Sequence, residues 1–188
     1  MSGGGSDSAY TYDDLGRVLT ETDSSGITKE YTYDTANNRL SLAIKQNGVV
    51  KTSTTYTYDR MNRLSQVYEN GMPIATYTFD ANGNRATLTY PNGDSVEYSY
   101  NLANKLLSLI NKRGNEVLSW YTYTYYLDGN QESKTDSAGT TNYVYDGLER
   151  LVSESKMGGK SRVYAYGVKG KCFFMTLIFM KSLWNNSL

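Results

Sequence analysis

Aromatic and polar side chains alternate along most of the chain. Over residues 95–100, one side of an extended strand would carry Val96, Tyr98 and Tyr100, while the other side would carry serine and glutamate. We find no apolar stripe with the 3.6-residue period of an amphipathic helix. The pattern therefore predicts half-buried β-strands and almost no helix.

A Tyr-x-Tyr motif, with phenylalanine as the second aromatic residue in one copy, recurs along the sequence. Its first tyrosines are separated by 21, 25, 21, 21, 25, 20 and 21 residues, and the motif holds 15 of the 19 tyrosines. Self-similarity at such a period identifies a tandem repeat. The motif positions are Tyr10 and Tyr12, Tyr31 and Tyr33, Tyr56 and Tyr58, Tyr77 and Phe79, Tyr98 and Tyr100, Tyr123 and Tyr125, Tyr143 and Tyr145, and Tyr164 and Tyr166.

Each period also contains two turn signals. The first lies six residues after the first tyrosine, where a glycine or asparagine that tolerates positive φ stands in six of the first seven copies and Glu149 stands in the other. The second is a glycine 15 to 17 residues after the same tyrosine. Two turns per period predict two strands, so each copy is expected to be a β-hairpin. The first signal is at Gly16, Asn37, Asn62, Gly83, Asn104 and Gly129, and the second at Gly26, Gly48, Gly71, Gly93, Gly114, Gly139 and Gly158 with Gly159.

The two faces of the predicted sheet differ in chemistry. The residue between the paired aromatics is threonine or serine in six of the eight copies, a choice suited to a wetter surface. We therefore expect the tyrosines to gather on one face, where each can bury on the order of 150 Å² and together dominate the packing.

The first turn of each hairpin predicts a cross-strand pair. Asp13 and Arg17 flank a three-residue loop that ends in glycine, a pattern typical of a type I turn followed by a left-handed residue and a bulge. Such exposed pairs are expected to fix the register rather than to supply most of the stability. The same reasoning pairs Asp59 with Arg63, Asp146 with Arg150 and Asn101 with Lys105, and, with one more loop residue, Asp34 with Arg39 and Asp80 with Arg85. In the copy where Tyr126 stands at the aspartate position, Gln131 stands at the arginine position, so both charges are absent together.

Composition removes several classes of function. Nineteen basic residues balance nineteen acidic ones, so no excess charge is available to bind nucleic acid or an anionic membrane surface. The chain has no histidine and one cysteine, Cys172, which excludes His-based triads, His/Cys zinc sites and an intrachain disulfide. The apolar run Cys172–Met180 is too short to span a bilayer. We therefore expect no enzyme: no catalytic residue, no cofactor, no bound metal and no membrane insertion.

Copies such as YTYDDLGRVLTETDSSGITKE, YTYDRMNRLSQVYENG and YTFDANGNRATLTYPNGDSVE resemble the YD repeats of the Rhs family. The resemblance covers Tyr10 to Tyr166. That family includes bacterial Rhs toxins, the C components of insecticidal toxin complexes, wall-associated proteins and teneurins, in which tandem hairpins form a spiralling sheet that encloses a hollow shell. The resemblance implies an all-β fold, here a partial YD-repeat β-shell with a curved or spiralling sheet, in a secreted or cell-surface protein.

The chain differs from the large shell-forming members in two respects. It has about eight copies, and it lacks the DPxGL-type motif that closes the shell in the toxin-bearing members, with no aspartate beyond Asp146. Sixteen strands at about 4.8 Å would make a sheet about 77 Å wide, too narrow to enclose a toxin domain when rolled. The sequence thus favours the repeat architecture over a cargo-bearing shell.

Three segments follow from these patterns. Residues 1–9 are a polar N-terminal segment without the features of a signal peptide, and residues 10–166 hold the eight hairpins. Residues 167–188 form an apolar tail that lacks tyrosine, interpreted as a cap on the last strand, an intersubunit strand or aberrant coding sequence.

The leading functional hypothesis is a non-catalytic wall or scaffold of a YD-repeat shell. Its partners would be other YD-repeat segments or copies of itself, joined through open sheet edges. Two alternatives stay open: a carbohydrate-binding or cell-surface adhesin that stacks glycans on its tyrosines, and a subunit of a homopolymeric fibre.

Overall fold

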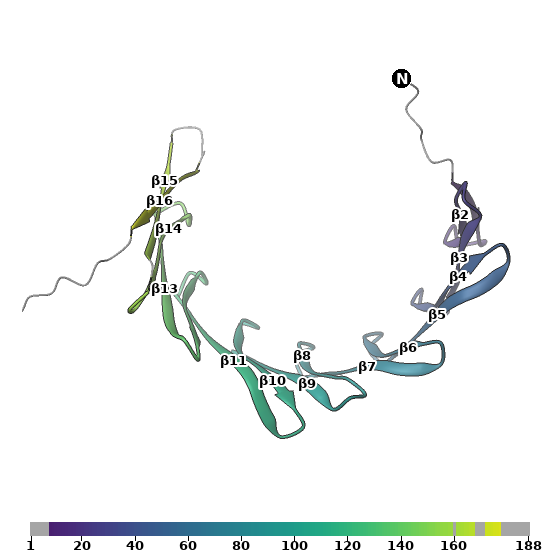
Figure 1. Cartoon of the computed structure of the whole chain (residues 1–188), viewed down its shortest axis with the longest axis horizontal. Helices are drawn as coiled ribbons and strands as arrows, with labels where there is room; N and C mark the ends of the chain where they lie inside the picture. The colour runs from purple at the N-terminus through teal and green to yellow at the C-terminus, as the bar shows by residue number, and fades with distance from the viewer. Residues whose placement is uncertain (1–7, 160, 168–171, 178–188) are drawn as a thin grey trace, which may run out of the picture. The chain divides into compact units, whose positions relative to one another are not determined.

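A computed structural model describes residues 8–159, 161–167 and 172–177, and within these ranges the chain is built of strands and turns without helix. Sixteen antiparallel strands follow one another in the sheet in chain order, with no crossover. The chain divides into two compact units, Met1–Ser95 and Val96–Leu188, and within each unit consecutive strands lie side by side (Figure 1). The all-β class and the tandem hairpins are as the repeat predicts.

The first unit holds the strands from β1 to β8, and β9 spans the boundary between the units. Their bounds are β1 (Ala9–Tyr12), β2 (Val18–Thr22), β3 (Ile27–Tyr33), β4 (Arg39–Gln46), β5 (Val49–Tyr58), β6 (Leu64–Glu69), β7 (Met72–Phe79), β8 (Arg85–Thr89) and β9 (Asp94–Tyr100). The second unit continues with β10 (Leu106–Arg113), β11 (Glu116–Tyr125), β12 (Gln131–Asp136), β13 (Gly139–Tyr145), β14 (Leu151–Lys156), β15 (Ser161–Tyr166) and β16 (Cys172–Leu177). Each odd-numbered strand forms a hairpin with the next strand, and we number these hairpins 1 to 8.

The turn inside each hairpin explains why the Asp-x-x-Gly sequence folds back. In hairpin 1 the Gly16 amide donates to the Asp13 carbonyl at 2.9 Å, and the Asp13 amide donates to the Arg17 carbonyl at 2.9 Å. Gly16 has φ of 76°, and the register of β1 and β2 shifts between Thr11 and Tyr12. This is a type I turn with a left-handed residue and a bulge, as predicted. Even the exception, Glu149, adopts the left-handed conformation, with φ of 59°.

Two of the turns between hairpins are two-residue loops with the sequence Asn-Gly. Asn47 and Gly48 have φ of 51° and 76°, and Asn70 and Gly71 have φ of 49° and 80°. Two consecutive positive φ angles define a type I′ turn, whose twist suits a tight connection between antiparallel strands.

The sheet carries little sealed core. Among the described residues, Val67 and Ala75 are the most buried hydrophobic side chains, at 9% and 8% exposed, and no described side chain is below 2% exposed. Burial alternates at the Tyr-x-Tyr motif, where exposed Thr32 lies between half-buried Tyr31 and Tyr33. The aromatic rings are thus covered by neighbours on their own face of the sheet rather than by a second layer.

Pairing within a hairpin extends further than pairing between hairpins. Strand β3 pairs with β4 as far as Tyr33, whereas its pairing with the preceding β2 ends at Glu30. The same difference recurs where β5 meets β4 and where β7 meets β6. The Tyr-x-Tyr residues therefore lie where consecutive hairpins separate, and we call each such place an aromatic seam.

The tail interpreted as a cap, an intersubunit strand or aberrant sequence is only partly described. Within it, β16 pairs antiparallel with β15 from Cys172 to Leu177 and so continues the sheet. Residues 168–171 and 178–188 lie outside the described residues. In the part of the chain that the structure describes, no helix is long and apolar enough to cross a membrane.

Candidate functional site: the aromatic seams

A tyrosine hydroxyl closes most of the described seams. The second tyrosine of a hairpin donates to a main-chain carbonyl at the start of the last strand of the preceding hairpin. This bond satisfies a carbonyl that the backbone ladder leaves unpaired at the separation. The bonds are Tyr33 to Val18 at 2.9 Å, Tyr58 to Arg39 at 2.7 Å, Tyr125 to Leu106 at 2.8 Å and Tyr166 to Leu151 at 2.8 Å.

A cation from the preceding turn covers the aromatic ring at alternate seams. The Arg17 guanidinium lies 4.7 Å from the centroid of the Tyr33 ring, and Arg63 lies 4.3 Å from that of Phe79. A cation over an aromatic face is attracted by the ring quadrupole. In the second unit, Lys105 lies over Tyr125 at 5.4 Å and Arg150 over Tyr166 at 4.5 Å.

Arg17 shows how one side chain joins two hairpins. Its Nε donates to the Asp13 carboxylate at 2.6 Å within its own turn. Its Nη1 donates to the Asp34 carbonyl at 3.0 Å and to the Asn37 amide oxygen at 2.9 Å in the next turn. The fork of guanidinium donors thus sets both the turn and its spacing from the next turn.

The same carboxylate-to-cation contact recurs where the sequence places aspartate and arginine four residues apart. Arg63 lies 2.6 Å from Asp59, and Arg150 lies 2.6 Å from Asp146. In hairpin 5 the Asn101 side chain accepts from the Lys105 amide at 2.9 Å, while the Lys105 ammonium donates to the Gly129 carbonyl at 2.7 Å.

The pairing of Asp34 with Arg39 and of Asp80 with Arg85 is wrong. The Asp34 amide donates to the Asn38 carbonyl, and the Asn38 amide group donates to the Asp34 carboxylate at 2.9 Å. Asn84 does the same for Asp80 at 3.1 Å. The loop therefore keeps its length, and asparagine replaces arginine as the partner of the aspartate.

The displaced arginines stack inside their own hairpins. Arg39 lies one residue beyond the turn, opposite Tyr33 in the register, and its guanidinium lies 4.8 Å from the Tyr31 ring. Arg85 lies at the same distance from the Tyr77 ring. A shift of one residue changes the direction of a strand side chain, which explains why these arginines leave the turn.

The assignment of Gln131 to the last position of this turn is also shifted by one residue, because Asn130 occupies that position. The Tyr126 amide donates to the carbonyl of Asn130, not Gln131. The Tyr126 ring meets the next hairpin instead: its hydroxyl donates to the Tyr143 carbonyl at 3.0 Å, and its ring packs edge-on against Tyr145 at 6.4 Å.

Successive hairpins thus alternate in chemistry. A cation occupies the last turn position in hairpins 1, 3, 5 and 7, whereas asparagine occupies it in hairpins 2, 4 and 6. Asparagine side chains also link turns, because the Asn38 amide donates to Asn62 at 3.1 Å. The pattern of turn contacts therefore repeats every two hairpins rather than every hairpin.

Hydroxyl pairs line the face opposite the aromatic rings. Each threonine or serine between paired aromatics in hairpins 1 to 6 hydrogen-bonds a hydroxyl on the neighbouring strand, at 2.6 to 2.9 Å. Such cross-strand pairs stabilise a register in which the two faces differ. The pairs are Thr11 with Thr20, Thr32 with Ser41, Thr57 with Ser65, Thr78 with Thr87, Ser99 with Ser108, and Thr124 with Ser133.

Ionisation at the seams follows these contacts. The hydrogen bond from the Arg63 side chain holds the pKa of the Asp59 carboxyl below its usual value, and the Asn38 side chain does the same for the pKa of Asp34. Burial raises the pKa of several ladder tyrosines, among them Tyr123, Tyr125 and Tyr143. The seams therefore favour ionised aspartates and neutral tyrosines.

In hairpins 1 and 4, the second residue of the motif makes no hydroxyl bond to a preceding hairpin within the described residues. Tyr10 and Tyr12, in the first hairpin, stack on each other at 6.4 Å and are 48% and 57% exposed. Phe79 carries no hydroxyl to donate. Sequence reasoning missed Asn38, Asn84 and Asn130, although their constant spacing of seven residues from the first tyrosine was a usable signal.

No three histidine, cysteine, aspartate or glutamate residues converge within the described ranges in a way that could hold a metal ion. In the same ranges no buried side-chain polar atom lacks a hydrogen-bond partner. What the arrangement does is hold one hairpin to the next.

Comparisons with known proteins agree with this architecture. The RHS Repeat family model matches residues 12–50 and 79–116. No curated protein matches the chain in sequence.

One solved structure shares the fold, and a second has a lower similarity. A chain of the TcdB2-TccC3-Cdc42 crystal structure is similar over 90% of this chain, with 20% identity and a TM-score of 0.51. A chain of the TcdB2-TccC3-TEV structure is similar over the same share, with 14% identity and a TM-score of 0.48. This chain covers 9% and 15% of those chains, so it corresponds to a small part of each.

The two matched segments, the constant hairpin period and the shared fold lead to one conclusion. Residues 12–50 and 79–116 match RHS repeats, and the hairpin architecture of the chain is similar to that of a chain in the TcdB2-TccC3-Cdc42 structure.

Proposed function

We propose that the chain is a non-catalytic wall segment of a YD-repeat shell. The observation that supports this is the use of the aromatic ladder for internal contacts. At the seam between hairpins 1 and 2, the Tyr33 ring is covered by Arg17 and its hydroxyl is bonded to Val18. Residues that are engaged in this way join hairpins and are not free to stack on a ligand.

The repeat positions would then have structural roles. Aspartates fix turns, cations and asparagines link one turn to the next, and tyrosines close the seams. We assign these roles to the repeat array of residues 10–166, with residues 1–9 and 167–188 as flanking segments. Partners would be further YD-repeat segments or copies of the chain, in a secreted or cell-surface setting, as the match of two segments to RHS repeats suggests.

A glycan array separates the wall from the adhesin. The wall predicts that the chain retains no glycan through its aromatic ladder, and that Tyr56→Ala changes folding stability but not glycan retention. Glycan binding that is lost in Tyr56→Ala while circular dichroism shows the fold intact would contradict the proposal and favour the adhesin.

Sedimentation velocity separates the wall from the fibre. A wall segment predicts discrete species of defined size as the protein concentration rises. Open-ended polymers whose length grows with concentration would instead support the homopolymeric fibre.

A further inference from the structure

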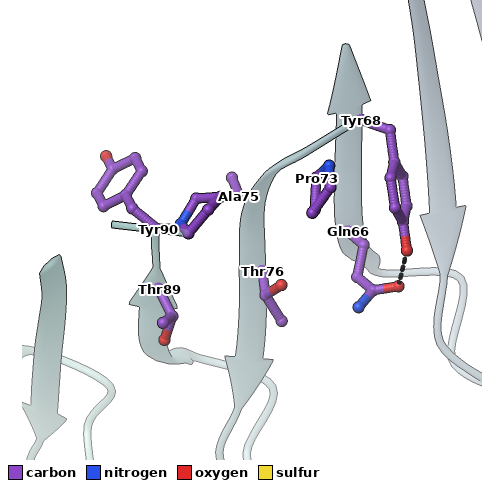
Figure 2. Close-up of a pocket in the computed structure, with 8 residues that line it drawn as sticks. Gln66, Tyr68, Pro73, Ala75, Thr76, Thr89 and Tyr90 are labelled. Atoms are coloured by element: carbon purple, nitrogen blue, oxygen red, sulfur yellow. Dashed lines mark hydrogen bonds between the residues drawn. The ribbon is translucent and has the colours of Figure 1, made fainter. Parts of the chain in front are cut away.

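Four residues that the repeat does not require converge on one pocket. Tyr68 and Tyr90 lie outside the Tyr-x-Tyr ladder, and Pro73 and Pro91 are the only prolines in the chain. All four line a pocket of about 370 Å³ in the first unit (Figure 2). No other hairpin carries an aromatic residue at the positions that match Tyr68 and Tyr90. Wall packing therefore does not account for them.

A row of polar side chains crosses the pocket. Gln66, Thr76 and Thr89 are register partners on the three adjacent strands β6, β7 and β8, so they lie side by side on one face. Figure 2 shows these residues between the Tyr68 and Tyr90 rings. Since neighbouring strands are about 4.8 Å apart, the two ends of the row are separated by about 9.6 Å.

The pocket offers hydrogen-bond donors without charge. The Tyr68 hydroxyl donates to Gln66 Oε1 at 2.8 Å, which fixes the amide so that both Nε2 protons remain to be donated elsewhere. The threonine hydroxyls can also donate. No charged side chain lines the pocket, so it suits a neutral ligand rather than an ion.

The strands here cannot take up a ligand by strand addition. Strands β6, β7 and β8 are already paired with one another, and Pro73 has no amide hydrogen. A ligand must therefore be held by side chains, namely the two tyrosine rings, the two proline rings and the row of hydrogen-bond donors formed by Gln66, Thr76 and Thr89.

A polyproline II helix fits this spacing. It repeats every three residues with a rise of about 3.1 Å per residue, so equivalent groups on one side recur at intervals of about 9.3 Å. Its carbonyl groups make no internal hydrogen bonds, and proline, which has no amide hydrogen, can only accept hydrogen bonds. Both the period and the need for donors match the row from Gln66 to Thr89.

We propose that this pocket binds a proline-rich segment of a partner protein in the polyproline II conformation. Prolines three residues apart pack against the Tyr68 and Tyr90 rings, and carbonyl oxygens accept from Gln66 Nε2 and the Thr89 hydroxyl. Residues 1–188 contain only Pro73 and Pro91, which both line the pocket, so no proline-rich segment within these residues can be the ligand. This binding does not depend on the wall function.

Isothermal titration of the full chain with a blocked nonaproline peptide tests the proposal. We expect saturable binding of nonaproline and none of a glycine-serine peptide of equal length. Tyr90→Ala should weaken binding by about tenfold or more, the scale expected of an aromatic anchor. Tyr126→Ala is the matched control, because Tyr126 is 40% exposed and Tyr90 is 41% exposed, and it should leave binding unchanged.

Two further arms keep the test decisive. Thr89→Val preserves the shape of the side chain but removes the hydroxyl, so it should weaken nonaproline binding without unfolding the protein, as checked by circular dichroism. Cellohexaose probes a neutral saccharide as the ligand instead. Absence of nonaproline binding, binding that persists in both Tyr90→Ala and Thr89→Val, or Tyr90-dependent binding of cellohexaose alone would each overturn the proposal.

Discussion

The Tyr33 hydroxyl donates a hydrogen bond to the Val18 carbonyl oxygen at 2.9 Å, joining hairpin 2 to hairpin 1. The bond spans the point where the backbone ladder between the hairpins has ended. Equivalent bonds from Tyr58, Tyr125 and Tyr166 repeat the arrangement. The second tyrosine of the motif is therefore a connecting group as well as a packing group.

Removing one hydroxyl should weaken one seam. Tyr58→Phe keeps the ring but leaves the Arg39 carbonyl without its donor, so we expect a loss of about 1 kcal/mol in the free energy of unfolding. Tyr58→Ala also removes the ring and should cost about 3 kcal/mol or more. Urea denaturation followed by circular dichroism measures both, and equal losses for the two variants would contradict a separate role for the hydroxyl.

The chain supplies the reverse experiment at Phe79. This residue occupies the position of the second tyrosine but has no hydroxyl, and Arg63 lies over its ring at 4.3 Å. Phe79→Tyr should gain up to about 1 kcal/mol by donating to the Leu64 carbonyl, the counterpart of Val18 and Arg39. A destabilised variant would show that this seam has no room for the hydroxyl.

The alternation of turns predicts which pairs are energetically coupled. Double-mutant cycles in urea should show measurable coupling between Asp59 and Arg63 and between Asp34 and Asn38, because each pair shares a hydrogen bond. Asp34 and Arg39 should show none. Coupling between Asp34 and Arg39 that exceeds that between Asp34 and Asn38 would contradict the observed turn geometry.

The sequence predicted the hairpins because their signals are local. Alternation of side chains, the spacing of Tyr-x-Tyr and the glycine or asparagine six residues later each report on a few neighbouring residues, and all lead to the same turn. The prediction that Arg39 pairs with Asp34 is wrong because it relied on opposite charge, whereas the length of the loop decides which residue faces the aspartate. The constant spacing of the left-handed residue identifies Asn38 as the residue at the turn.

The seams themselves could not be derived in this way. The bond from Tyr58 to the Arg39 carbonyl joins residues 19 apart, and its acceptor is a main-chain atom that carries no sequence signal. The position of Arg17 over Tyr33 depends on where the ladder between two hairpins stops. The pocket between Tyr68 and Tyr90 likewise depends on the register of three strands.

A backbone outlier gives a stabilising prediction. Glu149 has φ of 59° at a position where six other hairpins place glycine or asparagine. Glu149→Gly should raise the free energy of unfolding by about 0.5 to 1 kcal/mol. Glycine avoids the penalty of about 1 to 2 kcal/mol that a side chain incurs in the left-handed conformation, but it loses more conformational entropy on folding than glutamate does. Gly16→Ala, at φ of 76°, should have the opposite sign, and thermal unfolding compares the two.

Acid should weaken the turns. The Arg63 side chain lowers the pKa of Asp59, and the Arg150 side chain lowers the pKa of Asp146, each by hydrogen bonding to the carboxylate. A lowered folded-state pKa gives stability that is present above the unfolded value of about 3.9 and is lost as pH falls through the folded-state value. Thermal midpoints should therefore fall below about pH 4. Asp59→Asn, which cannot ionise, should show a shallower fall, and an unchanged slope would contradict this role of the carboxylate.

Alkali should act on the seams in the opposite direction. Burial raises the pKa of Tyr31, Tyr123, Tyr143 and Tyr145, so the folded state holds their hydroxyl protons more tightly than the unfolded chain does. A raised folded-state pKa gives stability that is fully present below the unfolded value of about 10 and is lost as pH rises through the folded-state value. The thermal midpoint should therefore fall above about pH 10, in step with the ultraviolet absorbance of tyrosinate. Tyr143→Phe keeps a ring in the ladder and removes one titrating group, so its midpoint should fall less steeply than that of the wild type. A midpoint that stays constant while tyrosinate forms would show that the rings ionise without disturbing the seams.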